Sequence, residues 1–161
     1  MRSKFDKTAH PIQAASSIID VEAINDFFNL SGIKNDLHWF TYKDTLERAY
    51  EREDRELYYI EETSGLLIGA LMVWCESRVL DEHEAQIRLV AVSEVNRGVG
   101  IGHYLCEEAE KFARSHGKKQ MIADVVEGSP AVGFWKSIGY EVQSEWKTKK
   151  GTRMLTVEKQ L

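Results

Sequence analysis

The chain contains 161 residues, of which 43% are hydrophobic and 10% aromatic, enough apolar material for one domain with a hydrophobic core. This composition argues against a disordered chain, and the presence of only two cysteines argues against a disulfide scaffold. The formal net charge of −5 disfavours a broad nucleic-acid-binding surface and favours cationic partners. We therefore expect a single domain over residues 1–161.

Targeting and membrane-spanning segments are not expected. Residues 1–7 lack the apolar stretch of a signal peptide, and the most apolar run, residues 66–75, is far shorter than the roughly 20 residues that cross a bilayer. Cys75 and Cys106 suit a reducing compartment, in which both would be buried thiols. We expect a cytoplasmic protein with no membrane or nucleic-acid partner, and a homodimer is left open.

The first half of the chain predicts two helices followed by a hairpin. A short strand comes first, and Asp20 then caps a helix that stops at Ser31 and Gly32. The second helix carries interleaved charges of both signs, which indicates a solvated face. The elements expected here are a strand at 12–15, helices at 21–30 and 44–53, and strands at 57–61 and 66–75.

The second half predicts strands that alternate with helices. An apolar strand leads through a glycine-rich loop into an amphipathic helix that ends at His116 and Gly117. This order predicts an α/β fold of the α+β kind, with a mixed, mostly antiparallel sheet and helices on both faces. The elements expected here are strands at 86–92 and 120–126, helices at 101–115 and 131–137, and a closing hairpin of 140–147 with 154–158.

The most informative segment is the loop of residues 97–103. Its glycines, Gly98, Gly100 and Gly102, have no Cβ where the backbone turns into the helix, which leaves the first helical N–H groups unblocked. Free amides at a helix N-terminus attract phosphate, and Arg97 adds a positive charge beside them. The loop therefore predicts a site for a phosphorylated cofactor.

Two phosphate-binding motifs fail on this loop. A P-loop requires a lysine where this sequence has His103, and a dinucleotide fingerprint requires a third glycine where His103 or Leu105 stands. The surviving pattern is Arg-x-x-Gly-x-Gly, formed by Arg97, Gly100 and Gly102. It resembles the pyrophosphate-binding loop of the GCN5-related N-acetyltransferase (GNAT) superfamily. A glycine-rich turn without a ligand is the alternative.

A second segment strengthens the resemblance. Residues 131–141 resemble a later helix and strand start of that family, with an aromatic pair, a basic residue and a glycine followed by an aromatic. The resemblance covers about residues 85–145 and implies the GNAT fold, with acetyl-CoA as co-substrate. It implies that the edge of the central strand pairs with the pantetheine arm and that the loop amides hold the pyrophosphate. The cofactor-binding residues so implied are Val90, Ala91, Val92, Arg97, Gly98, Val99, Gly100, Ile101, Gly102, His103 and Trp135.

The catalytic residues that the resemblance implies are incomplete. The N–H of Val92 is the candidate donor to the thioester oxygen. Family members often carry Glu or His as base on the central strand, but the matching positions here hold Gln86 and Arg88, and neither takes up a proton at neutral pH. Glu84, just upstream, is the candidate general base, and a solvated loop carboxylate is the alternative for it.

The family's usual acid is also replaced. Trp135 stands where a tyrosine often lies near the sulfur of coenzyme A, and an indole donates a hydrogen bond but is no practical acid. Tyr140 occupies the place of a structural phenylalanine, so we expect it to pack. Water, Tyr58 or Tyr59 is then expected to protonate the leaving thiolate.

Other candidate residues are assigned to structure. The five histidines show no metal-ligand spacing, so no metal is expected. No base stands next to Cys106, which indicates a buried thiol and not a nucleophile. Trp39, Phe40 and Tyr42 either line a substrate cleft or pack against the second helix.

The resemblance implies an N-acetyltransferase that moves an acetyl group from acetyl-CoA to a primary amine of a small molecule, peptide or protein by direct attack. The acidic residues Asp81, Glu82 and Glu84 favour a cationic acceptor. The alternative is a non-catalytic module that binds or senses acyl-CoA, which Trp135 and the missing base favour. A structural fold with an empty loop is the third reading.

Overall fold

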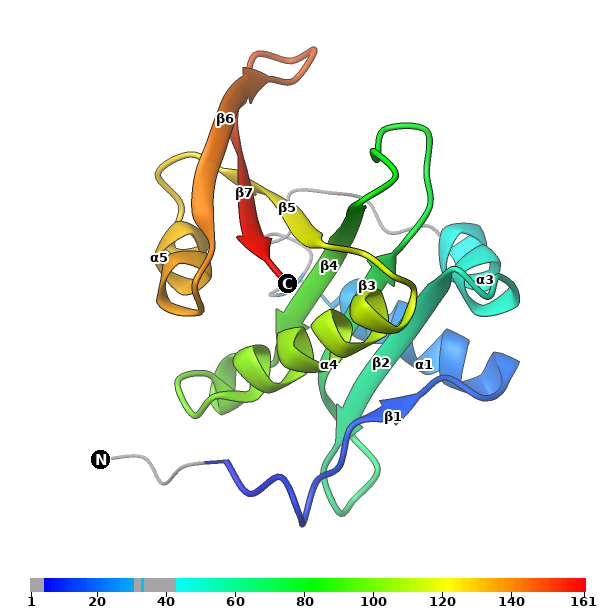
Figure 1. The fold of residues 1–161 in the computed structure, drawn as a ribbon. Coiled ribbons are helices and arrows are strands. Elements are labelled where there is room, and N and C mark those ends of the chain that lie inside the picture. Colours follow the sequence, from blue (N-terminus) through cyan, green and yellow to red (C-terminus); the bar gives the residue numbers. More distant parts are fainter. Residues whose placement is uncertain (1–4, 31–32, 34–42) are drawn as a thin grey trace.

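The computed structural model describes residues 5–30, 33 and 43–161 (Figure 1). A seven-stranded sheet runs through it in the order β1-β2-β3-β4-β5-β7-β6. The strands are β1 (Gln13–Ala14), β2 (Arg55–Glu61), β3 (Leu67–Trp74), β4 (Glu84–Val92), β5 (Gln120–Val126), β6 (Glu141–Lys147) and β7 (Arg153–Gln160). The described helices are α1 (Ile18–Phe28), α3 (Lys43–Glu51), α4 (Ile101–Ser115) and α5 (Pro130–Ser137), with a 3-10 turn at Glu94–Asn96.

The sheet is mixed and mostly antiparallel, because β4 and β5 form its parallel pair and the other neighbours run antiparallel. Helix α4 crosses one face, and α1 and α3 lie on the other (Figure 1). The parallel pair requires a crossover, which α4 supplies. The predicted fold class is confirmed.

Two clusters of buried apolar side chains hold the helices to the sheet. On one face, Leu105 of α4 and Trp135 of α5 pack into the cluster that contains Leu71 and Val157. On the other face, Ile24 of α1 and Leu46 of α3 belong to a separate cluster of buried residues. Each fully buried large apolar side chain contributes about 1.5–3 kcal/mol, so both faces of the sheet are firmly covered.

The parallel pair is joined along only part of its length. Glu84–Gln86 of β4 pair with Gln120–Ile122 of β5, and the described register ends there, although both strands continue. β3 stays paired with β4 as far as Val92. The two central strands therefore diverge, and the edge of residues 87–92 that faces β5 has no strand partner in the described structure.

The start of α1 differs from the prediction. Ser17 is the N-cap, and its hydroxyl accepts the N–H of Asp20 at 3.3 Å. The carboxylate of Asp20 in turn accepts the N–H of Ser16 at 2.9 Å. The prediction that Asp20 caps the helix was wrong, because both residue types suit that position and the carboxylate serves here as the partner in the first turn.

Two further expectations can be compared with the structure. Cys75 and Cys106 are free and buried, as predicted. In the described part of the chain, no helix is both long enough and apolar enough to cross a bilayer.

Candidate functional site

A cavity of about 660 Å³ opens where β4 and β5 diverge. One wall is the unpaired part of β4, and the opposite wall is the end of β5. The glycine loop and the start of α4 close one end, and α5 lies along the side. These segments contribute residues 87–92, 124–126, most of 96–103, and several positions of 129–138. The cavity therefore exists because the parallel ladder stops early.

The glycine loop is shaped by two different requirements. Gly98 and Gly100 have φ angles of +83° and +98°, in the left-handed region that strains any other residue. Gly102 lies in the first turn of α4, where an added Cβ would come within 2.9 Å of the Phe134 ring. The first two glycines let the chain turn, and the third lets α4 approach α5.

The loop presents unpaired backbone donors to the cavity. The first helical hydrogen bond runs from the N–H of Tyr104 to the carbonyl of Gly100 at 3.0 Å. The preceding amides of Ile101, Gly102 and His103 therefore have no acceptor within the helix. All three residues line the cavity. A helix N-terminus with such free donors carries a partial positive charge, which suits a phosphate group.

Arg97 holds its place through the backbone of β4. Its Nε donates a hydrogen bond to the carbonyl oxygen of Val92 at 3.1 Å, and the residue lines the cavity. This contact fixes a guanidinium beside the free amides of the loop. The combination of a fixed cation and helix-terminal donors is suited to a pyrophosphate.

The direction of the Val92 amide follows from the strand register. Ser93 donates its N–H to the carbonyl of Ile68, in the strand-to-strand direction. Successive residues of a strand alternate the direction of their N–H groups, so the N–H of Val92 points away from β3 and toward the open edge. A bound group along this edge would meet a free donor at that point.

Most of the predicted cofactor-binding residues lie together. Val99 is the exception: its side chain packs against the core, and its carbonyl accepts the N–H of Phe5 at 3.1 Å. The predicted residues that line the cavity are Val90, Ala91, Val92, Arg97, Gly98, Gly100, Ile101, Gly102, His103 and Trp135.

Glu84 lies apart from this cavity. It stands at the start of β4, where the parallel ladder is still paired, and does not belong to the lining. Only 7% of its surface is exposed, and its carboxylate accepts the N–H of Asp81 at 2.9 Å. It is therefore a buried strand residue and not a solvated loop carboxylate.

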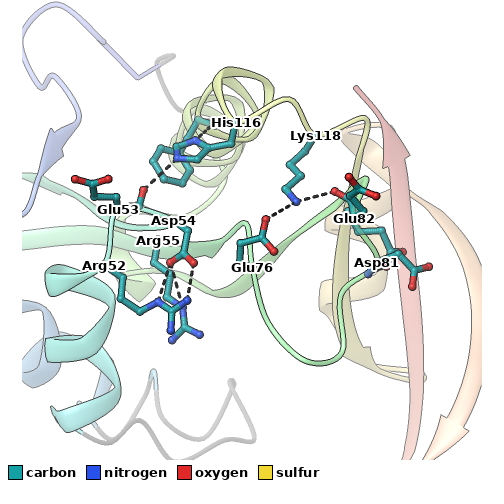
Figure 2. Close-up of polar contacts among 11 residues, drawn as sticks. Arg52, Glu53, Asp54, Arg55, Glu76, Asp81, Glu82, His116 and Lys118 are labelled. Atoms are coloured by element: carbon teal, nitrogen blue, oxygen red, sulfur yellow. Dashed lines mark hydrogen bonds and ion pairs between the residues drawn. The ribbon is translucent and has the colours of Figure 1, made fainter.

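The other acidic residues that suggested a cationic acceptor also lie outside the lining. Asp81 and Glu82 are in the loop before β4, where the carbonyl of Glu82 accepts Nζ of Lys118 at 2.7 Å (Figure 2). Lys118 also contacts the carboxylate of Glu76 at 3.0 Å. Lys118 therefore binds two points of the segment that connects β3 to β4.

Asp124 is the functional candidate that sequence reasoning missed. It lies in β5, and among the described lining residues it is the one with a carboxylate side chain. Oδ1 accepts the hydroxyl of Thr156 at 2.7 Å, and Oδ2 accepts the amide of Gln86 at 3.4 Å. A single acid inside the apolar strand Gln120–Val126 was the signal in the sequence that indicated it.

Trp135 and Tyr140 form an aromatic unit behind the cavity. Trp135 is 5% exposed and stacks edge-on with Phe134 at 5.3 Å and with Tyr140 at 4.8 Å. The Tyr140 hydroxyl donates to the carboxylate of Glu110 at 2.9 Å, and burial raises the pKa of Tyr140. Tyr140 therefore packs as predicted.

The other tyrosines considered as acids do not line the cavity. Tyr58 packs edge-on against Phe112 at 6.4 Å, and Tyr59 donates to the side chain of Gln13 at 3.2 Å. Burial raises the pKa of both hydroxyls. Of the three expected proton sources for the leaving thiolate, only water does not depend on a side chain outside the cavity. The aromatic residues of the segment 39–42 lie outside the described residues.

This geometry can be compared with known proteins. The sequence matches the model of the acetyltransferase (GNAT) family over residues 22–140, more than half of the chain. The chain belongs to the GNAT family. No curated protein shows significant sequence similarity to it.

Solved GNAT structures share the fold. A GNAT-family acetyltransferase from Streptococcus pneumoniae has a TM-score of 0.74 at 15% identity, over 94% of this chain and 99% of that one. The ribosomal-protein-S18-alanine N-acetyltransferase of Escherichia coli has a TM-score of 0.71 at 13% identity, over 94% and 93%. YncA of Salmonella typhimurium, solved with its cofactor acetyl-CoA, has a TM-score of 0.73 at 21% identity, over 95% and 94%. At these identities the likeness shows the GNAT fold.

Proposed function

We propose that this GNAT-family chain transfers an acetyl group from acetyl-CoA to a primary amine by direct attack in a ternary complex. The observation that carries the proposal is the open edge of β4, which leads directly to the free amides at the start of α4. One groove thus offers strand-like partners at one end and an anion site at the other. These are the two kinds of contact that a pantetheine arm and a pyrophosphate require.

The residues present fit acetyl-CoA. The amides of Ile101, Gly102 and His103, together with Arg97, suit the pyrophosphate, because donors and positive charge converge there. The edge of residues 90–92 suits the amide groups of the pantetheine arm, as an added strand would pair with it. The absence of a Cβ at Gly102 keeps the start of α4 close to α5.

When bound, acetyl-CoA supplies the acetyl group as an activated thioester. The N–H of Val92 points to the open edge and is proposed to donate to the oxygen that becomes negative during attack. The attacking amine must be neutral, and a carboxylate can take up its proton, directly or through water. Asp124 lines the cavity and fills this role better than Glu84, which would act only through a chain of waters.

Two hydrogen bonds position the Asp124 carboxylate for the proposed role of general base. Thr156 and Gln86 donate to its two oxygens, which fixes the carboxylate in the strand without neutralising its charge. Trp135 forms part of the cavity wall. Water is proposed to protonate the leaving thiolate. The chemistry uses an amine, a thioester and hydrogen-bond donors, so it requires no metal.

The second candidate is a module that binds acyl-CoA without turning it over. The observation that favours it is Trp135, which stands at the usual position of the acid and lines the cavity. For the compartment, we propose the cytoplasm, because the two buried cysteines are free thiols. The homodimer and the lack of membrane and nucleic-acid partners remain predictions.

Calorimetry and a thiol-release assay test the proposal together. Titration with acetyl-CoA should give saturable binding to the full chain, and a panel of primary amines should release free coenzyme A thiol above the rate without amine. Absence of acetyl-CoA binding would refute both candidates. Binding without amine-dependent thiol release, and without any acetylated amine by mass spectrometry, would favour the binding module.

A further inference from the structure

Two arginines contact one tryptophan ring beside the cavity. The Cζ atoms of Arg55 and Arg88 lie 3.6 Å and 4.5 Å from the centroid of the Trp74 ring. The three residues come from the neighbouring strands β2, β4 and β3. Arg88 belongs to the lining of the cavity, at the irregularity where β4 shifts its register against β3.

Neither guanidinium has a close ion pair within the described structure. Arg88 forms no ion pair with a described residue, although the more distant Asp124 attracts its charge, and its hydrogen bond, at 3.4 Å, goes to the side-chain oxygen of Gln86. Burial lowers the pKa of Arg88, as it does for Arg55. Arginine nevertheless stays protonated in proteins, so the positive charge remains, and Arg88 is exposed and lines the cavity.

Arg55 has only a long ion pair, because the neighbouring carboxylate of Asp54 is already hydrogen-bonded to Arg52. Asp54 receives two hydrogen bonds from Arg52, at 2.8 Å and 2.6 Å, and only approaches Nε of Arg55 at 4.0 Å (Figure 2). Nε of Arg55 and Nε1 of Trp74 are both buried without a hydrogen-bond partner. Buried donors without a hydrogen-bond partner are costly, and the two guanidinium groups also repel each other, which a bound anion would offset.

The position of Arg88 relative to Asp124 indicates which charges a bound acceptor would carry. Gln86 pairs with Ile122 at the end of the parallel ladder, and Arg88 and Asp124, two residues further along each strand, both line the cavity. One wall thus offers a cation and the facing wall an anion, at the point where the strands part. An acceptor with an amine and a compact anionic group would match both.

We infer that the amine acceptor carries a carboxylate or a comparable compact anion, as an amino acid does, and that Arg88 binds this group. The inference rests on the proposed acetyl transfer. The planar fork of an arginine matches a carboxylate with two parallel hydrogen bonds. Arg55 acts from behind Trp74 and adds to the positive potential, while Asp124 faces the amine.

A matched set of acceptors tests the inference. The twenty standard amino acids, their carboxamides and their decarboxylated amines are assayed with acetyl-CoA and the full chain, and aminoalkyl phosphonates are included beside the carboxylates. We expect kcat/KM to be about 10- to 100-fold higher for at least one anionic acceptor than for its carboxamide. The phosphonate arm shows which anion is preferred.

Arg88 variants assign the effect to this side chain. Arg88→Gln should remove most of the preference for the acid over the amide, chiefly through KM, and Arg88→Lys should restore part of it. Arg153→Gln, at an exposed position of β7 outside the cavity lining, is the matched control and should keep the preference. Calorimetry with acetyl-CoA should give similar affinities for all of these proteins, which shows that they are folded.

The outcomes separate this inference from the proposed function. Equal kcat/KM for acids and amides, or acetylation only of amines without an anion, would overturn the inference and leave the acetyltransferase proposal standing. A preference for acids that survives in Arg88→Gln would overturn the assignment to Arg88. Failure of acetyl-CoA to bind at all would instead refute the proposed function.

Discussion

Gly102 faces the ring of Phe134 so closely that a Cβ on it would lie 2.9 Å from a ring carbon. This contact joins the start of α4, which carries the free amides, to α5, which forms the side of the cavity. A conventional side chain at this position would push the two helices apart. The geometry of the proposed pyrophosphate site therefore depends on one missing methyl group.

Gly102→Ala should weaken acetyl-CoA binding by about 10-fold or more, since small displacements of positioned donors are costly. Overpacking should also lower the free energy of unfolding by about 1–3 kcal/mol. Gly133→Ala is the matched control: it is helical, its added Cβ meets nothing within 4 Å, and it lies outside the cavity lining. That variant should keep its affinity and gain up to about 1 kcal/mol in stability. Calorimetry and urea unfolding measure both quantities, and equal affinities would contradict the role of Gly102.

Asp124→Asn should lower kcat by about 100-fold, because an amide keeps the shape of the carboxylate but does not take up a proton. The hydrogen bond from Thr156 is retained by the remaining oxygen. The measurement is kcat at saturating amine and at fixed pH. Glu84→Gln is the comparison: a loss of kcat in that variant, and not in Asp124→Asn, would assign the base to Glu84.

Tyr140→Phe should lower the free energy of unfolding by about 1–3 kcal/mol, because it leaves a buried carboxylate with one donor fewer. The carboxylate belongs to Glu110, which is 3% exposed and also accepts Nζ of Lys159 at 3.0 Å. Tyr50→Phe, at an exposed position, is the control and should change stability little. Chemical denaturation measures the difference, and an unchanged midpoint for Tyr140→Phe would show that the hydrogen bond adds nothing.

The buried thiols should make the protein less stable at alkaline pH. Burial raises the pKa of Cys75 to about 11, whereas an unfolded cysteine ionises near about 8.5. The folded state holds its proton longer, so this stabilising contribution is complete below about pH 8.5 and is lost as the pH rises toward 11. Urea unfolding from pH 7.5 to 10, about that interval, measures the free energy of unfolding. This free energy should decline less steeply with pH in Cys75→Ala than in the unsubstituted protein. An identical decline would assign the effect to other groups.

The sequence was most informative where a function constrains the backbone. Gly98, Gly100 and Gly102, with Arg97, led to the loop and the family, and most of the residues predicted to bind the cofactor line one cavity. The strands were also predictable, because apolar residues alternate or run together along them. The cap of α1 was misjudged, since Ser17 and Asp20 satisfy the same rule and only the folded backbone shows which one precedes the first turn.

Asp124 and Arg88 show what required the tertiary structure. Each reads in the sequence as an isolated charge within a strand, and the residues are far apart along the chain. Their common cavity arises because the β4–β5 ladder stops after Gln86 and Ile122, and strand divergence is a property of packing on both sheet faces, not of local preference. Local periodicity and glycine spacing thus determined the elements and the cofactor loop. Only the three-dimensional arrangement decided which charged side chains line the cavity, because that depends on register and burial between distant strands.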